Sequence, residues 1–462
     1  MKKHHASRFV LLSVFSVLLA GCPNGNAEPD VLDAPSVDSA EIDAADITVD
    51  AGSDIGSQDA TPTDAPADSG DASVIPPHTL VPRSPCTTHL TPDPDGGPSD
   101  TAVQTAFVDA APGDVLCFDD GTYHFTRSLS LSQANITLQG TGDNAVLDFG
   151  GQTAGDNSML ATGNNFTIQY ITIKNTAANG VRVDGADHVT FRKVHALWDA
   201  GSSMANGAYA VYPVGCGFVL IEDCEVEGAA DAGIYVGQSH DVIVRYNVVH
   251  GNVAGIEFEN CTNSCGYSNW AYDNTAGLLV FNLPGLAVIG SGHANLHDNT
   301  VESNNRVNFC HPGGIVCEVP NGLGIMVLAA AHTEITSNTI RRNQSAGILV
   351  VDFRSATSGA SLPDGSTYDP RPQQICIHDN QYASNGTMPS GELMPLGVLR
   401  PDIVWDGFGV SGNSCADNSF TQLCIHESMV RFVCADIPGN MNPTVDLSVH
   451  SCACTGESCV SF

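Results

Sequence analysis

Short runs of β-branched and aliphatic residues recur along the middle of the chain, and apolar and polar positions alternate within them. Val219–Ile221, Gly233–Val236 and Val242–Val244 are examples. These runs are too short for helices, and alternation with a period of two residues is typical of strands. The pattern therefore predicts many short strands through the middle of the chain.

A second pattern repeats in step with these strands: an asparagine, four further residues and a second asparagine. The six pairs are Asn247/Asn252, Asn269/Asn274, Asn299/Asn304, Asn338/Asn343, Asn380/Asn385 and Asn413/Asn418. Their first members are separated by 22, 30, 39, 42 and 33 residues, and Cys224 takes the same place one copy earlier. We interpret the shortest separation as the base period and the excess as loop insertions.

Three short strands in about 22 residues form one coil of a right-handed parallel β-helix. Inward Val, Ile and Leu would stack coil on coil into an apolar core, and asparagine tolerates the left-handed bends at the corners. Residues 130–420 hold no long amphipathic helical pattern, which disfavours a helical or leucine-rich solenoid, and propeller blades need a longer constant period. The sequence thus predicts an all-β, single-stranded right-handed parallel β-helix with coils over about residues 115–425. The spacing of apolar residues in Ser99–Asp109 predicts a helix that caps its N-terminal end.

The first residues have the pattern of an export signal. Lys2, Lys3 and Arg8 precede the apolar stretch Phe9–Leu19, which is too short to span a bilayer. The stretch leads into Leu19-Ala20-Gly21-Cys22, which resembles a bacterial lipobox. We expect residues 1–21 to be a lipoprotein signal peptide and Cys22 to carry the lipid; an ordinary signal peptide with a chance cysteine is the alternative. By analogy with sorting rules, Pro23 after the cysteine favours the outer membrane or cell surface.

Residues 22–85 differ in composition from everything that follows. They contain no Phe, Trp or Tyr and are rich in Asp, Ala, Pro and Ser. Such a segment buries too little apolar surface to offset chain entropy, and like charges extend it. We predict a disordered acidic tether, with cation binding by its aspartates as the alternative. Residues 86–462 then form the β-helix with its N-terminal cap and a Cys-rich C-terminal tail.

Charge and cysteine content narrow the class of protein. The chain has 17 Lys+Arg against 51 Asp+Glu, a net charge of −34, which argues against binding nucleic acid through its phosphates.

There are 16 cysteines, and an exported chain with so many is expected to form disulfides. Plausible local pairs are Cys86/Cys117, Cys261/Cys265, Cys310/Cys317 and Cys424/Cys434, with a tail cluster at Cys452, Cys454 and Cys459. The cysteine spacings lack the paired form of zinc motifs, and we expect the scattered His195, His240, His250, His293 and His311 to be loop or surface residues rather than ligands.

Several segments resemble one known family. They are Gly228–Ser239, Asn252–Asn260, Asn274–Gly285, Asn308–Phe309 and Gly322–Ile325. They are similar to the bacterial parallel β-helix repeat-containing proteins, often lipoproteins, which have a pectin-lyase-like superfold. The resemblance covers roughly residues 130–350 and implies the fold but no agreed activity. Members tend to be encoded beside, or fused to, a second exported protein, so such a protein is an expected partner; the high cysteine content departs from the pattern.

Stacking the copies through the Gly-Ile register places side chains in columns. Val181, Val211, Ile234, Ile256, Leu278 and Ile348 fall in one inward column. Adjacent coils lie ~4.8 Å apart, so outward side chains on neighbouring coils would share one sheet face. That face would carry Arg182, Tyr212, Tyr235, Glu257 and Glu259, with Asp184, Gln238 and Asn260 at its edge.

This mixture of side chains is suited to sugars, because aromatic rings stack on sugar rings and amides and carboxylates bind hydroxyls. Glu257 and Glu259 could hold Ca²⁺, since hard cations prefer oxygen ligands, and we expect no other cofactor. Arg182 could abstract a proton beside a uronate carboxylate with a tyrosine as proton donor. The leading hypothesis is a lipid-anchored cell-envelope protein that binds polysaccharide on this face. The alternatives are a polysaccharide lyase or epimerase acting on uronate-containing glycan, a structural partner of another exported protein, and an ordinary solvated face.

Overall fold

The computed structural model describes residues 76, 78–357, 362, 367–409, 412–413, 415–437 and 441–459. All of them belong to one compact unit, Ser69–Phe462. The predicted signal peptide, the lipidation residue Cys22 and the tether up to residue 75 lie outside the described residues. Within the described part, no helix is long and apolar enough to cross a membrane.

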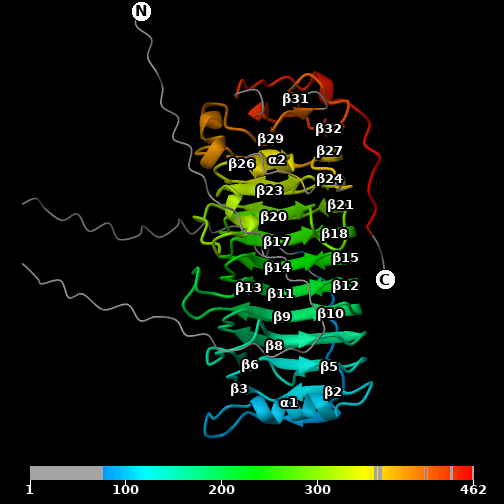
Figure 1. Cartoon of the computed structure of the whole chain (residues 1–462), viewed down its shortest axis with the longest axis vertical. Helices are drawn as coiled ribbons and strands as arrows, with labels where there is room; N and C mark the ends of the chain where they lie inside the picture. Colours follow the sequence, from blue (N-terminus) through cyan, green and yellow to red (C-terminus); the bar gives the residue numbers. More distant parts are fainter. Residues whose placement is uncertain are drawn as a thin grey trace, which may run out of the picture. The chain divides into compact units, whose positions relative to one another are not determined.

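The strands form two long parallel sheets whose members alternate along the chain, as expected when each coil contributes to both (Figure 1). The 11-stranded sheet consists, in spatial order, of β4 (Leu129–Leu131), β7 (Asn157–Ala161), β9 (Asn179–Asp184), β11 (Tyr209–Val214), β14 (Ala232–Gly237), β17 (Ala254–Glu259), β20 (Ala276–Phe281), β23 (Leu323–Leu328), β26 (Ala346–Val351), β29 (Ile403–Trp405) and β33 (Phe432–Cys434). We call it the narrow sheet.

The 20-stranded sheet holds two parallel series of strands that merge at the long strands β8 and β10. The first series is β1 (Thr88–Leu90), β2 (Val115–Phe118), β5 (Thr137–Gly140), β8 (Phe166–Lys174), β10 (Asp187–Leu197), β12 (Gly217–Glu222), β15 (His240–Arg245), β18 (Thr262–Tyr267), β21 (Gly292–His297), β24 (Ala331–Thr336), β27 (Gln373–His378) and β32 (Leu423–His426). The second is β3 (Gly121–His124), β6 (Ala145–Asp148), β13 (Glu225–Glu227), β16 (Val248–His250), β19 (Trp270–Tyr272), β22 (Thr300–Glu302), β25 (Thr339–Arg341) and β28 (Gln381–Ala383). We call it the broad sheet.

Helices are few and lie at the ends and in the loops. The predicted N-terminal cap is confirmed: α1 (Asp100–Asp109) buries Val103 and Phe107 and packs on β4. The remaining short elements are α2 (Phe353–Ala356), the 3₁₀ turns η1 (Ile315–Glu318), η2 (Gly391–Val398) and η4 (Ser448–His450), and the antiparallel pair β30 (Phe408–Gly409) and β31 (Gly412–Asn413).

The predicted register is confirmed along the narrow sheet. Val181 pairs with Val211, Val211 with Ile234, and Ile234 with Ile256, and the series continues through Leu278, Ile325 and Ile348. These inward side chains are almost fully buried and belong to one core that runs through the coils. A second apolar cluster lies on the opposite, outward face of the same sheet, so this face is not uniformly solvated.

The paired asparagines form two ladders at the coil corners. Asn274, for example, accepts from the Asn252 backbone N–H at 3.0 Å and donates through Nδ2 to Asn304 Oδ1 at 2.9 Å. The prediction that Asn413/Asn418 continue the series is wrong. Asn380 and Asn385 instead meet carboxylates, Glu427 and Asp402, because the last coil presents acidic groups in those places.

Within the part of the chain that the structure describes, six disulfides confirm that the cysteines are mostly paired. Two of the four expected pairs, Cys86–Cys117 and Cys310–Cys317, are present. The pairs Cys261/Cys265 and Cys424/Cys434 are wrong. Cys261 is free and buried, and the tail cysteines reach back to the broad sheet. The other four bonds are Cys265–Cys459, Cys376–Cys454, Cys415–Cys434 and Cys424–Cys452.

The last residues of the predicted tether lie against the β-helix. His78 forms an ion pair with Asp223 and stacks on Tyr246 with ring centroids 3.8 Å apart. Arg83 donates to the Gly140 and Gly142 carbonyls at 3.0 and 2.8 Å and covers the Tyr170 ring. The ordered body therefore begins before Cys86.

Candidate functional site: an aromatic and acidic face of the narrow sheet

The predicted face is built by four neighbouring strands of the narrow sheet, β9, β11, β14 and β17 (Figure 1). Arg182 pairs with Tyr212, and Tyr235 pairs with Glu257. One position further along the face, Gly237 pairs with Glu259. The register thus brings together the side chains that the sequence placed on this face.

Three tyrosine rings form the centre of the face. The Tyr209 ring lies 4.5 Å from the rings of both Tyr212 and Tyr235, and the Tyr212 and Tyr235 rings are 5.1 Å apart. The guanidinium of Arg182 lies 5.2 Å from the centroid of the Tyr212 ring and bonds Asp184 at 2.7 Å. Because Arg182 and Asp184 are partly exposed, this end of the face is open to solvent.

Three carboxyl groups, those of Asp231, Glu257 and Glu259, lie at the other end. Burial, followed by the charges of Asp231 and Glu259, raises the pKa of Glu257 well above its ordinary value. Burial raises the pKa of Asp231 to about 7, although a hydrogen bond from Tyr209 opposes the shift. Burial also raises the pKa of Glu259, which accepts a hydrogen bond from the Tyr235 hydroxyl. Carboxyl groups that share a dry site cannot all ionise cheaply, so this cluster holds protons near neutral pH.

The exposure of this acidic end differs from the expectation. Glu257 and Glu259 point out of the coil as predicted, but they are only 2% and 8% exposed, and Tyr235 is 5% exposed. Phe309, Cys310 and Ile315, from the segment between β22 and β23, pack on the same outward cluster. The segment is closed by the Cys310–Cys317 disulfide, and a Cβ placed on Gly314 would lie 3.8 Å from Asp231. This segment, inserted in a later coil, therefore lies against the acidic cluster at Asp231.

Gln238 and Asn260, expected at the edge of the site, instead hold a neighbouring loop. Asn260 is fully buried, donates to the Leu283 and Val288 carbonyls at 2.9 and 2.7 Å and accepts from the Leu283 N–H. Gln238 accepts from the Ala287 N–H at 3.0 Å. Both residues adopt positive φ at the end of their strands, where an amide side chain can reach the following loop.

Sequence reasoning missed Tyr209 and Asp231. A strict period of two would turn Tyr209 inward with Val211, but its ring packs on the outward cluster. The same break recurs in later coils, where Ala232 and Ala254 belong to the outward cluster and Ile234 and Ile256 to the core. The signal was therefore present: the Ala-Gly-Ile repeat, with a small residue before each inward position.

Two polar atoms of this face are buried without a hydrogen-bond partner, Nε of Arg182 and Oε2 of Glu257. They lie at opposite ends of the tyrosine cluster, and a buried polar atom without a partner is costly. Among the described residues, the side-chain groups arranged to share a metal ion lie on the broad sheet and on the C-terminal tail beside it, rather than here. Calcium binding by Glu257 and Glu259 stays a prediction.

Comparisons with known proteins identify the fold. Residues 158–317 match the model of the right-handed β-helix region. Among solved structures, the A-module of the mannuronan C-5 epimerase AlgE4 of Azotobacter vinelandii is 16% identical, with a TM-score of 0.50, 73% of this chain and 93% of that chain covered. A polygalacturonase from Erwinia carotovora ssp. carotovora is 9% identical, with a TM-score of 0.44, 67% of this chain and 96% of that chain covered. The search of curated proteins gave no match. Together with the stacked parallel coils, the match to the family model and the likeness to the AlgE4 A-module confirm the predicted fold, a right-handed parallel β-helix of the pectin-lyase-like type.

Proposed function

We propose that this protein binds a polysaccharide of the cell envelope on the outward face of β9, β11 and β14. The observation that carries the proposal is the group of three tyrosine rings that pack against one another on two neighbouring coils, beside Arg182, whose Nε is buried without a partner. Aromatic faces stack on the apolar faces of sugar rings, and a guanidinium with free donors binds sugar hydroxyls or carboxylates.

The exposure of the residues supports different roles for them in this proposal. Tyr212 is half-buried and Arg182 and Asp184 are partly exposed, so these three side chains can contact a ligand directly. Tyr235 is buried next to Tyr212 and is fixed by its hydrogen bond to Glu259. The glutamates then act as supports for the aromatic platform rather than as direct sugar contacts.

The same proposal includes the place where the protein works. A lipid on Cys22 and an acidic tether would hold the β-helix away from an outer-membrane or cell-surface bilayer, where envelope polysaccharide is found. A lipid-anchored protein needs its acyl chains for stable membrane attachment. Replacing Cys22 with Ser should abolish lipid labelling and release the protein from membranes; continued acylation and membrane retention of C22S would contradict the anchor.

The binding proposal is tested with a glycan array followed by calorimetric titration of the best ligand. Tyr212→Ala removes a half-buried ring that packs on the outward cluster and not on the core inside the coils, so the fold should survive. The affinity for the glycan should fall by about tenfold or more, the equivalent of ~1.4 kcal/mol of stacking. Tyr272→Ala on the broad sheet is the matched control, since its ring stacks on His250 on a different face. Equal affinity of Y212A, Y272A and the wild type would rule this face out.

A second candidate is cleavage of the bound glycan, and one observation favours it. Asp231, with its pKa raised to about 7, can hold a proton at neutral pH and donate it to a glycosidic oxygen. Proton abstraction by Arg182, as a uronate lyase would need, is less favoured because Arg182 is paired with Asp184. Ultraviolet detection of unsaturated uronates and reducing-end release, measured for the wild type and Asp231→Asn, separate lyase, hydrolase and simple binder.

A further inference from the structure

The C-terminal tail crosses the broad sheet as a strap that is bonded to successive coils. Cys452 is joined to Cys424 on β32, and Cys454 to Cys376 on β27. Cys459 is joined to Cys265 on β18, three coils further back. The partners of the strap lie in one register column, Cys265–Asn295–Glu334–Cys376–Cys424. On the two coils between the Cys376–Cys454 and Cys265–Cys459 disulfides, those of β21 and β24, the strap is held by hydrogen bonds instead.

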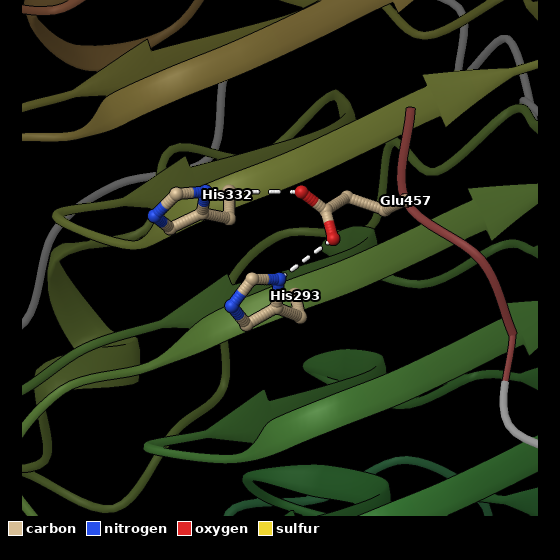
Figure 2. A group of neighbouring side chains, drawn as sticks. All are labelled: His293, His332 and Glu457. Carbon is tan, nitrogen blue, oxygen red and sulfur yellow. Dashed lines mark hydrogen bonds and ion pairs between the residues drawn. The ribbon is translucent and has the colours of Figure 1, made fainter. Parts of the chain in front are cut away.

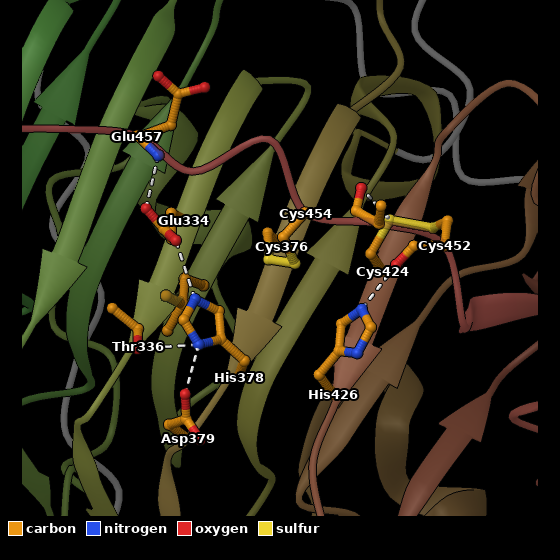
Figure 3. The surroundings of a disulfide bond; sticks show 12 residues. Glu334, Thr336, Cys376, His378, Asp379, Cys424, His426, Cys452, Cys454 and Glu457 are labelled. Atoms are coloured by element: carbon orange, nitrogen blue, oxygen red, sulfur yellow. Dashed lines mark hydrogen bonds and ion pairs between the residues drawn. A yellow bond between two sulfur atoms is a disulfide. The ribbon is translucent and has the colours of Figure 1, made fainter.

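Those hydrogen bonds fix the position of Glu457. Its backbone N–H donates to Oε2 of Glu334 at 2.6 Å (Figure 3). Its carbonyl accepts from Nδ2 of Asn295. The disulfide of Cys459 holds the chain two residues further on. The carboxylate of Glu457 is therefore placed by the fold and not by chance contact on a loose tail.

Two histidines from adjacent coils face this carboxylate. His293 on β21 and His332 on β24 both have positive φ, and their imidazole rings stack with centroids 4.6 Å apart. Nδ1 of His293 lies 2.7 Å from one oxygen of Glu457, and Nδ1 of His332 lies 3.7 Å from the other (Figure 2). Figure 2 shows the Nε2 atoms directed away from the carboxylate. All three donor atoms lie within 4.8 Å of one another.

We propose that His293, His332 and Glu457 form a binding site for a divalent transition metal of the Zn²⁺ type. Two imidazole nitrogens and one carboxylate are donors that suit Zn²⁺ and its neighbours, and they do not suit Ca²⁺ or Mg²⁺. Tetrahedral Zn²⁺ with bonds of about 2.0–2.2 Å separates its donor atoms by roughly 3.3 Å. The observed separations between the histidine Nδ1 atoms and the Glu457 oxygens, 2.7 and 3.7 Å, bracket this value. Side-chain rotations that move these atoms by less than about 1 Å therefore admit the ion.

The metal ties the strap to two coils and keeps a coordination position open to solvent. His293 and His332 are partly exposed, so water can complete the ligand set. A neighbouring trio, Glu334, Cys376 and His378, lacks this capacity. Cys376 is in a disulfide, and both oxygens of Glu334 are occupied, one by His378 and the other by the Glu457 backbone (Figure 3).

The test is titration of the full-length, disulfide-intact protein, first freed of metal, with Zn²⁺ in the presence of excess Ca²⁺. The excess Ca²⁺ occupies surface carboxylates, so the titration reports nitrogen-containing sites. We expect one Zn²⁺ per chain, with affinity that falls as the pH is lowered through the histidine range because the imidazoles must be neutral. Substitution by Co²⁺ should give a visible spectrum of nitrogen and oxygen ligation without a thiolate charge-transfer band.

The variants His293→Ala, His332→Ala and Glu457→Gln each remove one ligand, and each should weaken binding by more than the ~100-fold that loss of an outer partner costs. The control is His188→Ala. His188 also has positive φ at the start of a broad-sheet strand, β10, but lies far along the stack from Glu457. Glu457→Gln is nearly isosteric and leaves the six disulfides in place, so it separates lost ligation from lost folding. Absence of Ca²⁺-resistant binding, a thiolate band, or binding that survives in all three variants would overturn the proposal.

Discussion

The buried carboxyl cluster should make the protein less stable as the pH rises, and Asp231 is the group with which to measure this. In the unfolded chain its pKa has the ordinary value of 3.8, and in the folded protein burial raises the pKa to about 7. Between these two values the folded state holds a proton that the unfolded state has lost. The contribution of Asp231 to the free energy of unfolding therefore falls with rising pH across this window and is constant on either side of it.

The magnitude follows from the difference between the two pKa values. A difference of about 3 pH units at ~1.36 kcal/mol per unit corresponds to a loss of about 4 kcal/mol between pH 4 and pH 7. Raised pKa values at Glu257 and Glu259 act in the same direction, and the three groups titrate as a cluster. Asp231→Asn removes the ionisable group and keeps the shape of the side chain. The variant should therefore gain stability relative to the wild type as the pH rises.

The assay is denaturant unfolding of the wild type and Asp231→Asn at steps between about pH 4 and about pH 8. The difference in unfolding free energy should grow by up to about 4 kcal/mol in favour of D231N over this range. Asp184→Asn is the control, since Asp184 lies on the same face but is 45% exposed and paired with Arg182. A difference between D231N and wild type that does not change with pH would refute the reasoning, because the carboxyl would then be ionised in the folded protein throughout.

Two further predictions concern the β-helix itself. Asn274→Ala leaves the Asn252 N–H and the Val249 carbonyl without their buried partners. In thermal or denaturant unfolding, this variant should lower the free energy of unfolding by about 2–6 kcal/mol. The control Asn263→Ala removes one exposed hydrogen bond and should lower it by about 1 kcal/mol. Burial raises the pKa of the Cys216 thiol to about 11 and of the Cys224 and Cys261 thiols to about 12. A thiol reagent should therefore react with none of the three in the native protein, and with all three after unfolding without reductant. Fast labelling of the native protein would contradict the burial of these thiols.

The fold was predictable because the period of a repeat shows which residues pair on neighbouring strands. The 22-residue spacing between Gly233-Ile234 and Gly255-Ile256 leaves no room for slippage, and a slip by one residue would bring Glu257 into the core. The asparagine ladders were predictable for the same reason, since each rung requires the same residue one coil later. The sixth pair failed because a terminal coil has no following rung to satisfy and can substitute any acceptor, here Glu427 and Asp402.

The disulfides and the burial of the site were not predictable from local spacing. Cys265 and Cys459 are 194 residues apart, and their proximity depends on the path of a tail that has no repeat. In the same way, the segment around Gly314 lies against Asp231 although it is inserted much later in the chain, between β22 and β23. A period gives the position of a side chain on its own coil, but an inserted loop can cover a coil to which it does not belong.

The inserted loops also determine from which side a ligand can reach the tyrosine face. The coils from Asn269 onward are 30 to 42 residues apart, and segments inserted there carry Phe309, Phe353 and Leu393, which pack on the outward face of the narrow sheet. The coils that carry Tyr235 and Glu257 are 22 residues apart and have no insertion of that length. The face is therefore walled on its C-terminal side, whereas Arg182 and Asp184 remain partly exposed on the N-terminal side. We therefore expect a polysaccharide that binds here to approach along β9 and to meet Arg182 and Tyr212 before the acidic cluster. Substitutions at Arg182 should then change the association rate constant more than substitutions at Tyr235 do.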